Sequence, residues 1–516
     1  MSSRSSSFPR ALLLASVALI AGCSAGPDFK QPDKPKEQGY TPETLDTQTA
    51  GAPGVHGGAA QTIEPGRDIP GDWWTLFRSQ ELSALVEEAM RGNPDVDAAQ
   101  ASLRQANELL YSQQGALFPT IGAKGSAVNQ RVNGAQSGID SPAVQFGVTS
   151  ASLNIAYSPD LFGGVRRQVE AQGAQADYQR FQLEATYLTL TSNVVVAAVN
   201  LASLRAQIAA TQQVIRLQTD ALNLVQTQFN LGGAAQSDVL QQQANLRATQ
   251  ATLPPLQKAL AQQRNGLMRL LGRSPTEDAG QGLRLDTLHL PEELPLSLPS
   301  QLVDQRPDVR SAVAQLHTAS ANIGVAVSAQ MPQFNITGAL GFTSLGFQTM
   351  FSPASTVWNL GISLAQTLFD GGQLDHNRKA AIAAYDKAAA QYRGTVLSAF
   401  QDVANALRAI QADADGLRAA VAAEQTAAAS LNLSQQQYQF GAVNYLALLQ
   451  AQQTYQNAVL SRVKAQATRY SDTAALFQAL GGGWWNRNDV APQSKGKPGV
   501  FTLPPIDQLH LPRAGH

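Results

Sequence analysis

The sequence predicts an α+β membrane protein in which one unit of helices and strands occurs twice. Three observations predict this class. Short motifs recur at nearly constant spacing in the two halves of the chain. Within each half, the apolar residues change from helical spacing to strict alternation and back to helical spacing. The resulting four strands are too few to close a sheet inside a membrane, so other chains must complete it.

The internal repeat is visible in several motifs. Asn93-Pro94-Asp95-Val96 returns as Arg306-Pro307-Asp308-Val309, Pro119 as Pro332, and Leu271-Gly272 as Leu480-Gly481. These matches place a first repeat at 72–273 and a second at 299–483, joined by a linker at 274–298. We therefore expect the two repeats to share one order of elements.

Each repeat begins with a helical stretch, at about 79–115 and about 299–329, that runs to a proline. Two strand-like runs follow, with turns rich in Gly, Ser, Asn and Pro at about 131–143 and 343–355. In the second repeat the apolar residues lie at alternate positions: Phe334, Ile336, Leu340, Phe342, Trp358, Leu360, Ile362 and Leu364. In the first repeat the parity changes between Val148 and Leu153, which indicates a β-bulge or an incorrect strand assignment.

A long helical segment follows each pair of strands, at about 164–231 and about 373–440. Each would be about 100 Å long at about 1.5 Å per residue. A shorter helix then returns, at about 235–270 and about 445–479. Apolar residues step by three and four along these helices, which favours a coiled-coil seam over an ordinary amphipathic bundle. Pro254-Pro255 predicts an interruption in the first returning helix that the second lacks.

Closure of the sheet requires several chains. An open sheet edge in lipid leaves unpaired backbone groups that cost several kcal/mol each. Membrane barrels need about eight strands or more. Three chains with twelve strands would form such a barrel, and two chains with eight are not excluded by counting. In either ring, the alternating apolar positions are expected to face lipid and the polar positions to face the lumen.

The N-terminus has the pattern of a lipoprotein signal peptide at 1–22, with a basic start, a short apolar run and small residues before Cys23. Cys23 is the single cysteine of the chain. We expect it to become the mature N-terminus and to carry a diacylglycerol and an N-acyl chain that anchor the protein to membrane lipid. The alternative is a chance cysteine after an ordinary signal sequence. The segment 23–71 and the tail 484–516 are predicted to be extended.

Composition and motifs argue against nucleic-acid binding and catalysis. The net charge is −1, so no basic field favours nucleic acid. The 6 histidines lack metal-ligand spacing, and the sequence lacks dinucleotide-binding and Walker glycine patterns. We therefore predict no catalytic residues, no metal site and no cofactor besides the lipid on Cys23.

Several motifs together resemble the TolC-like outer membrane factor family, of OprM/NodT type. The resemblance covers nearly the whole mature chain and rests on the start at 23–29, Asp72-Trp73-Trp74, the motif at 93–96, Leu117-Phe118-Pro119, Asp160-Leu161-Phe162-Gly163-Gly164 and Leu480-Gly481-Gly482-Gly483-Trp484. It implies a homotrimer with a twelve-stranded outer-membrane β-barrel that continues into a long periplasmic α-helical barrel. It also implies two partners, a periplasmic membrane-fusion adaptor and an inner-membrane pump. The lipidation motif mildly favours a pump of resistance-nodulation-division type.

The same resemblance places function at the two turns farthest from the membrane. It implies that the adaptor contacts these turns, whose small residues are Gly232, Gly233, Ala234, Gly441, Ala442 and Val443. Relatives often close the tip with charged links, which suggests Asp238 as a gate, although its position also fits a helix cap. The second turn carries no charge from 440 to 449. Tyr438, Asn444 and Tyr445 are therefore candidates for neutral hydrogen bonds or for narrowing the pore there.

The predicted function is that of the outer-membrane channel of a tripartite efflux system, which passively conducts drugs or other small molecules from the pump to the outside. One alternative is an outer-membrane duct for type I protein secretion. Another is a lipid-anchored periplasmic coiled-coil scaffold without a pore. The scaffold hypothesis leaves the alternating runs at 333–342 and 357–368 unexplained.

Overall fold

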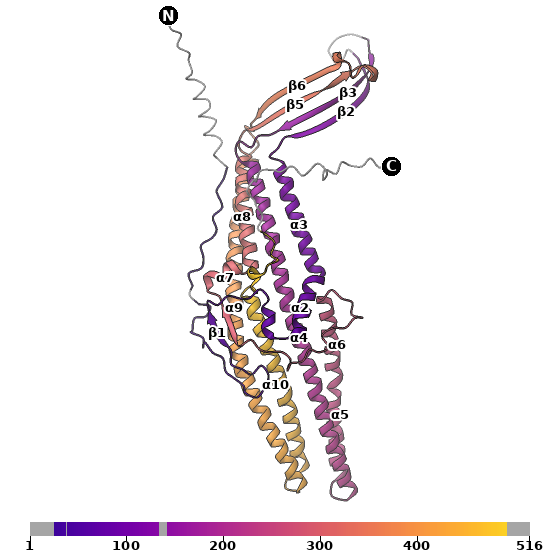
Figure 1. Cartoon of the computed structure of the whole chain (residues 1–516), viewed down its shortest axis with the longest axis vertical. Coiled ribbons are helices and arrows are strands. Elements are labelled where there is room, and N and C mark those ends of the chain that lie inside the picture. Colours follow the sequence, from indigo (N-terminus) through magenta and orange to yellow (C-terminus); the bar gives the residue numbers. More distant parts are fainter. Residues whose placement is uncertain (1–24, 38, 134–141, 493–516) are drawn as a thin grey trace.

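The computed structural model describes residues 25–37, 39–133 and 142–492. The described chain is elongated, with a β-sheet at one end, packed helices along its length and two helical hairpins at the other end (Figure 1). Cys23 and the predicted signal peptide lie outside the described residues. The same holds for part of the predicted turn at 131–143 and for most of the tail at 484–516.

The helical stretch that opens each repeat is divided into two helices. The helices are α2 (Gln80–Gly92), α3 (Pro94–Gly115), α7 (Pro299–Gln305) and α8 (Pro307–Ser328). The residue before each proline is extended, with φ −79° and ψ 123° at Asn93 and φ −79° and ψ 124° at Arg306. Proline disfavours helical geometry in the residue before it but fits the first position of a helix. The motif that revealed the repeat is therefore a helix boundary, and the single stretch expected at each place is divided there.

The four predicted strands form one antiparallel sheet of order β2-β3-β5-β6. The strands are β2 (Thr120–Val132), β3 (Val144–Tyr157), β5 (Gln333–Ser344) and β6 (Thr356–Ala365). The bulge considered for β3 is absent, because β2 and β3 pair in one continuous register from Thr120–Ala156 to Val132–Val144. Val148 and Leu153 therefore lie on opposite faces of a regular strand.

One face of this sheet is apolar and exposed. Trp358, Leu360 and Ile362 each have more than 70% of their surface exposed, and the pairing register places Leu153 and Leu340 on the same face. The opposite face carries polar residues: Lys124, Ser126, Asn154, Thr337, Asn359 and Ser363. Within the described residues, the outer edges of β2 and β6 have no neighbouring strand.

The long helices match their predicted bounds. They are α4 (Gly164–Asn230) and α9 (Gln373–Gln439), each of 67 residues. Helix α4 contains a stretch of residues that is long and apolar enough to cross a membrane, but 56% of that stretch is buried inside the chain. We interpret it as a core helix that packs against α8 and α10.

The returning helices differ as predicted. In the first hairpin, α5 (Gln236–Ala251) and α6 (Leu253–Leu270) are separated at Thr252. Pro254 and Pro255 lie in the first turn of α6, where a missing backbone N–H costs little. In the second hairpin, α10 (Tyr445–Ala479) is continuous. The predicted interruption in the first hairpin alone is confirmed.

The main hydrophobic core lies at mid-height, where the N-terminal segment and the linker meet the helices. The short strands β1 (Thr62–Pro65) and β4 (Glu293–Leu296) pair in parallel there. Trp73, in the 3-10 helix η1 (Trp73–Phe77), stacks on Phe477 of α10 with ring centroids 5.2 Å apart. The three remaining 3-10 helices of the described chain are η3 (Phe347–Thr349), η4 (Pro353–Ser355) and η5 (Trp484–Asn486). This belt holds the helices together between the sheet and the hairpin tips.

Candidate functional site at the hairpin tips

The two long helices end in turns of the same geometry. Gly232 has φ +77° and Gly441 has φ +72°, a left-handed conformation that favours glycine. The backbone N–H of the next residue then bonds back into the helix, from Gly233 to Gln228 O at 2.8 Å and from Ala442 to Gln437 O at 2.8 Å. The repeat therefore preserves the turn as well as the helices.

Asp238 and Asn444 both satisfy backbone donors at the start of a returning helix. The Asp238 carboxylate accepts a hydrogen bond from the backbone N–H of Ala235 at 3.3 Å. Asp238 is thus not the capping residue of α5, which is Ala235. It is the third residue of the helix, and its side chain reaches back to the backbone of the capping residue. Asn444 caps α10, because its side-chain oxygen accepts from Ala447 N at 3.0 Å. Its polar group is used within its own helix and not in a link to the other hairpin.

Two tyrosines connect the hairpins. The Tyr438 hydroxyl donates to Gln228 Oε1 at 3.0 Å. The Tyr445 hydroxyl donates to Gln242 Oε1. The two rings contact each other edge to face, with centroids 5.4 Å apart. Since both tyrosines belong to the second hairpin and both glutamines to the first, these bonds hold the two tips together.

The environment keeps the two tyrosine hydroxyls neutral. Burial raises the pKa of Tyr445 above its ordinary value, and Tyr438 and Asp238 raise it further. Burial also raises the pKa of Tyr438, with a second contribution from the charge of Asp238. The phenols therefore stay protonated as hydrogen-bond donors. Asp238 lies close enough to act on both through its field, so the structure brings together three of the four predicted gate residues.

Above the tyrosines, the seam between the hairpins contains buried amides. Gln218 and Gln242 are fully buried, and Gln242 Nε2 donates to the backbone oxygen of Gln218 at 2.8 Å. The side-chain amide groups of Gln218 and of Gln452 in α10 have no hydrogen-bond partner among the described residues. Buried polar groups without a protein partner are commonly satisfied by ordered water. The seam therefore contains polar groups that only partly satisfy one another, whereas the core at mid-height is apolar.

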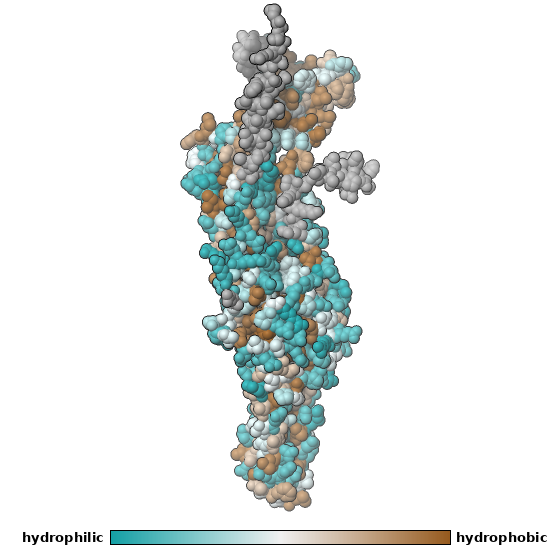
Figure 2. Space-filling model, turned by 60° about the vertical axis from the view of Figure 1, so that its left-hand side comes forward, coloured by the Kyte–Doolittle hydropathy of each residue, from teal (hydrophilic) through white to brown (hydrophobic). Residues whose placement is uncertain are grey.

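The surface of the tips is apolar. Leu231 is 81% exposed and Phe440, the corresponding residue of the second repeat, is 86% exposed. Of the predicted adaptor-contacting residues, Gly232, Gly233, Gly441 and Ala442 are exposed, whereas Ala234 and Val443 are half-buried. Apolar side chains gather over the sheet and again at the opposite tip, as Figure 2 shows. Large exposed apolar residues at the end of a helical hairpin are typical of a docking surface.

Gln228 and Gln242 were not predicted from the sequence as partners of the tyrosines. A signal for Gln242 was available, because it precedes Leu246 by four residues and so continues the coiled-coil seam. Gln228 lies beside the seam residue Phe229, and its pairing depends on how the hairpins meet.

These features are those of an outer-membrane duct protein: a sheet with an exposed apolar face and open edges, joined to long helices of about 100 Å that end in hairpins. The chain belongs to the outer membrane efflux protein family, whose model matches residues 85–273 and 298–482. It is therefore an outer-membrane protein of efflux systems.

The comparisons with individual proteins agree. The chain is 31% identical over 464 residues to the pyoverdine export outer membrane protein OpmQ of Pseudomonas aeruginosa, covering 86% of this chain and 94% of OpmQ. It is 27% identical over 481 residues to the probable efflux pump outer membrane protein TtgC of Pseudomonas putida, covering 92% and 96%. Among solved structures, the outer-membrane channel OprN matches with a TM-score of 0.81 and 28% identity, covering 90% of this chain and 100% of OprN.

Proposed function

We propose that three copies of the chain form a twelve-stranded barrel in the outer membrane that continues into a periplasmic helical barrel. The observation that carries this proposal is the apolar face of the sheet between the open edges of β2 and β6. Lipid would cover the face, and strand pairing between chains would satisfy the edges. Three chains give a barrel with a water-filled lumen more readily than two, since eight strands leave an interior that side chains fill.

The duct would conduct its cargo passively, without catalysis. The polar face of the sheet would line the lumen, and the inner-membrane pump, of resistance-nodulation-division type, would select the cargo. We propose drugs or other small molecules as that cargo. The relative OpmQ is named for the export of pyoverdine, which supports a small molecule. An acylated Cys23 would add a lipid anchor beside the barrel.

The tips would serve two purposes. A periplasmic membrane-fusion adaptor would dock on the exposed turns, with Gly232, Gly233, Gly441 and Ala442 allowing close approach beside Leu231 and Phe440. A Cβ atom at Gly232 or Gly441 would meet nothing within 4 Å, so this surface is open in the single chain. The Tyr438 and Tyr445 bonds would hold the tips closed until the adaptor separates the hairpins.

The test is reconstitution of the full mature protein. We expect an oligomer whose gel migration changes on heating, a mass of three chains by native mass spectrometry in detergent, and ion conductance in planar bilayers. A mass of two chains would overturn the trimer. Absence of both conductance and heat-modifiable migration would overturn the channel. Mass spectrometry of the N-terminal peptide would show the added acyl groups, and an unmodified Cys23 thiol would overturn the lipid anchor.

A further inference from the structure

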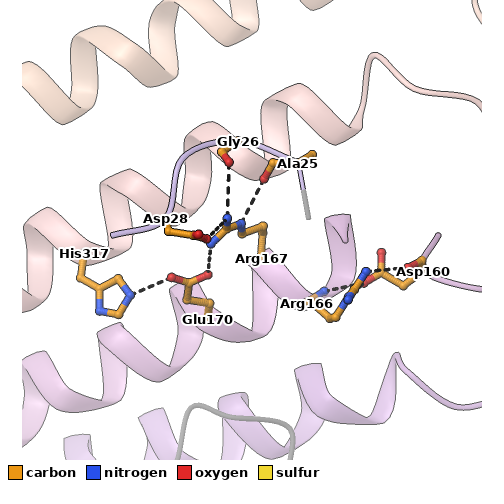
Figure 3. Close-up of polar contacts among 8 residues, drawn as sticks. All are labelled: Ala25, Gly26, Asp28, Asp160, Arg166, Arg167, Glu170 and His317. Atoms are coloured by element: carbon orange, nitrogen blue, oxygen red, sulfur yellow. Dashed lines mark hydrogen bonds and ion pairs between the residues drawn. The ribbon is translucent and has the colours of Figure 1, made fainter. Parts of the chain in front are cut away.

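The first described residues of the chain lie on the junction between α4 and α8, which we call the groove, at the end of these helices nearest the four-stranded sheet. Arg167 of α4 is only 4% exposed, and its guanidinium donates to Ala25 O at 3.0 Å and to Gly26 O at 3.5 Å. The same guanidinium forms an ion pair of 2.7 Å with Asp28. Figure 3 shows the arginine extended toward this segment. One buried side chain thus binds three oxygen-bearing groups, on Ala25, Gly26 and Asp28.

The segment also touches the helices through its backbone. Gly26 has φ +82°, and a Cβ atom there would lie 2.4 Å from the Cα of Gly324 in α8. A Cβ atom on Gly324 would lie 2.7 Å from Ala25 O. In addition, the backbone N–H of Ala25 donates to Phe162 O at 2.9 Å. No side chain fits at Gly26 or Gly324 without displacing backbone, so the contact depends on these two glycines.

Two further residues complete the groove. Glu170 accepts from Arg167 at 2.6 Å and lies 2.8 Å from His317 Nε2. The hydrogen bond from His317 lowers the pKa of Glu170, and Arg167 lowers it further, so the carboxylate stays ionised beside the arginine. The His317 ring stacks on Phe29 with centroids 4.2 Å apart and an angle of 12°. The segment is therefore held at Ala25, at Asp28 and at Phe29 by separate contacts.

The internal repeat shows that the groove is specific. Helices α4 and α9 have equal lengths, as do α3 and α8, so their residues correspond one to one. The counterpart of Arg167 is His376, and the counterpart of Gly324 is Tyr111. Tyr111 is 58% exposed and would occupy the place where the backbone of 25–26 passes. The residues that bind the segment are therefore not repeated at the corresponding positions of α9 and α3.

We propose that the groove formed by Arg167, Glu170, His317 and Gly324 is an intramolecular receptor for residues 25–29, which fixes the place where the mature N-terminus leaves the protein. Cys23 is two residues before Ala25, so its sulfur bond to any lipid begins within roughly 7–10 Å of the groove. Without the receptor, the chain would next be attached at the belt at mid-height. The residues before that belt, and with them the N-terminus, would then have no fixed position on the protein surface. Docking does not need the lipid; the placement of acyl chains rests on the proposed acylation of Cys23.

The experiment compares amide hydrogen exchange of residues 25–30 in detergent-solubilised full-length variants, read by mass spectrometry of the N-terminal peptide. Arg167→Ala is expected to accelerate this exchange at least about tenfold, which corresponds to about 1.4 kcal/mol. Arg166→Ala is the matched control. Arg166 is the adjacent residue, but it binds Asp160 at 3.2 Å and points away from the segment (Figure 3).

Two more variants keep the test decisive. Gly26→Val leaves every groove residue intact and is expected to release the segment even if Arg167→Ala folds poorly. Cys23→Ser, exported with a signal peptide that is removed without acylation, is expected to keep the protection. Wild-type protection in both Arg167→Ala and Gly26→Val would overturn the receptor. Loss of protection in Cys23→Ser would show that lipid, and not the groove, holds the segment. Neither result depends on conductance, so failure of the channel proposal is separately visible.

Discussion

The Tyr445 hydroxyl group offers the sharpest test of how the tips are held together. Tyr445→Phe removes the bond to Gln242 and leaves the ring, which is 5% exposed, in its apolar surroundings. Gln242 is fully buried, so its side-chain oxygen would lose its partner while shielded from water. A buried acceptor left without a partner costs about 1–3 kcal/mol. This cost falls on the closed tip alone, because separated hairpins expose Gln242 to solvent.

The expected result is a shift toward the open tip. A cost of about 1–3 kcal/mol per chain raises the ratio of open to closed states by roughly 5- to 150-fold. Single-channel recording in planar bilayers should therefore show longer open periods or higher mean conductance. Tyr455→Phe is the matched control, since Tyr455 packs against the buried apolar cluster that contains Tyr445, and its hydroxyl has no hydrogen bond within the described residues. Unchanged conductance in both Tyr445→Phe and a double variant that adds Tyr438→Phe would refute the idea that the phenols close the tip.

Three further predictions concern a cap, a buried acid and the sheet. Asp238→Ala should lower the melting midpoint through loss of about 0.5–1 kcal/mol of helix capping, with unchanged conductance; raised conductance would make Asp238 a gate. Burial raises the pKa of Glu184, 3.3 Å from Arg487, to about 7. The wild-type protein should therefore lose stability as pH rises from about 4.5 through 7 by about 3 kcal/mol. Glu184→Gln should remove this dependence on pH. An equal change of melting temperature between pH 5 and pH 8 in the wild type and in Glu184→Gln would contradict the prediction. Ile362→Lys on the apolar face should reduce the heat-modifiable oligomer at a cost of about 2–4 kcal/mol, whereas Ser363→Lys on the polar face should not; equal yields would contradict the assignment of faces.

The helices, the strands and the interruption of the first returning helix follow directly from the sequence. The two 67-residue helices, the four strands and the interruption at Thr252 all come from periodicity and proline positions, which are local properties of the chain. The change of parity in β3 was the misleading pattern. It reflects apolar residues such as Val148 on the polar face near the outer end of the strand, and the paired register excludes a bulge.

Features that depend on distant contacts were not predictable in the same way. The pairing of β1 with β4 joins four-residue strands separated by more than two hundred residues, and so short a strand has no periodicity to detect. The groove for 25–29 depends on Arg167, which in sequence is one of two adjacent arginines in an amphipathic helix. At the tips, Tyr438, Tyr445 and Asp238 were selected for their chemistry, but the glutamine acceptors emerge only when the hairpins are packed together.

The interruption at Thr252 gives the two hairpins different mechanical properties. A continuous helix such as α10 transmits a push or a twist along its whole length. The joint between α5 and α6 lacks the backbone N–H groups of Pro254 and Pro255, so fewer hydrogen bonds resist bending there. In a closed ring of chains, stiff and compliant hairpins would alternate around the circumference. A force applied at the tips would then bend the returning helix of the first hairpin near Thr252 more easily than it would bend α10.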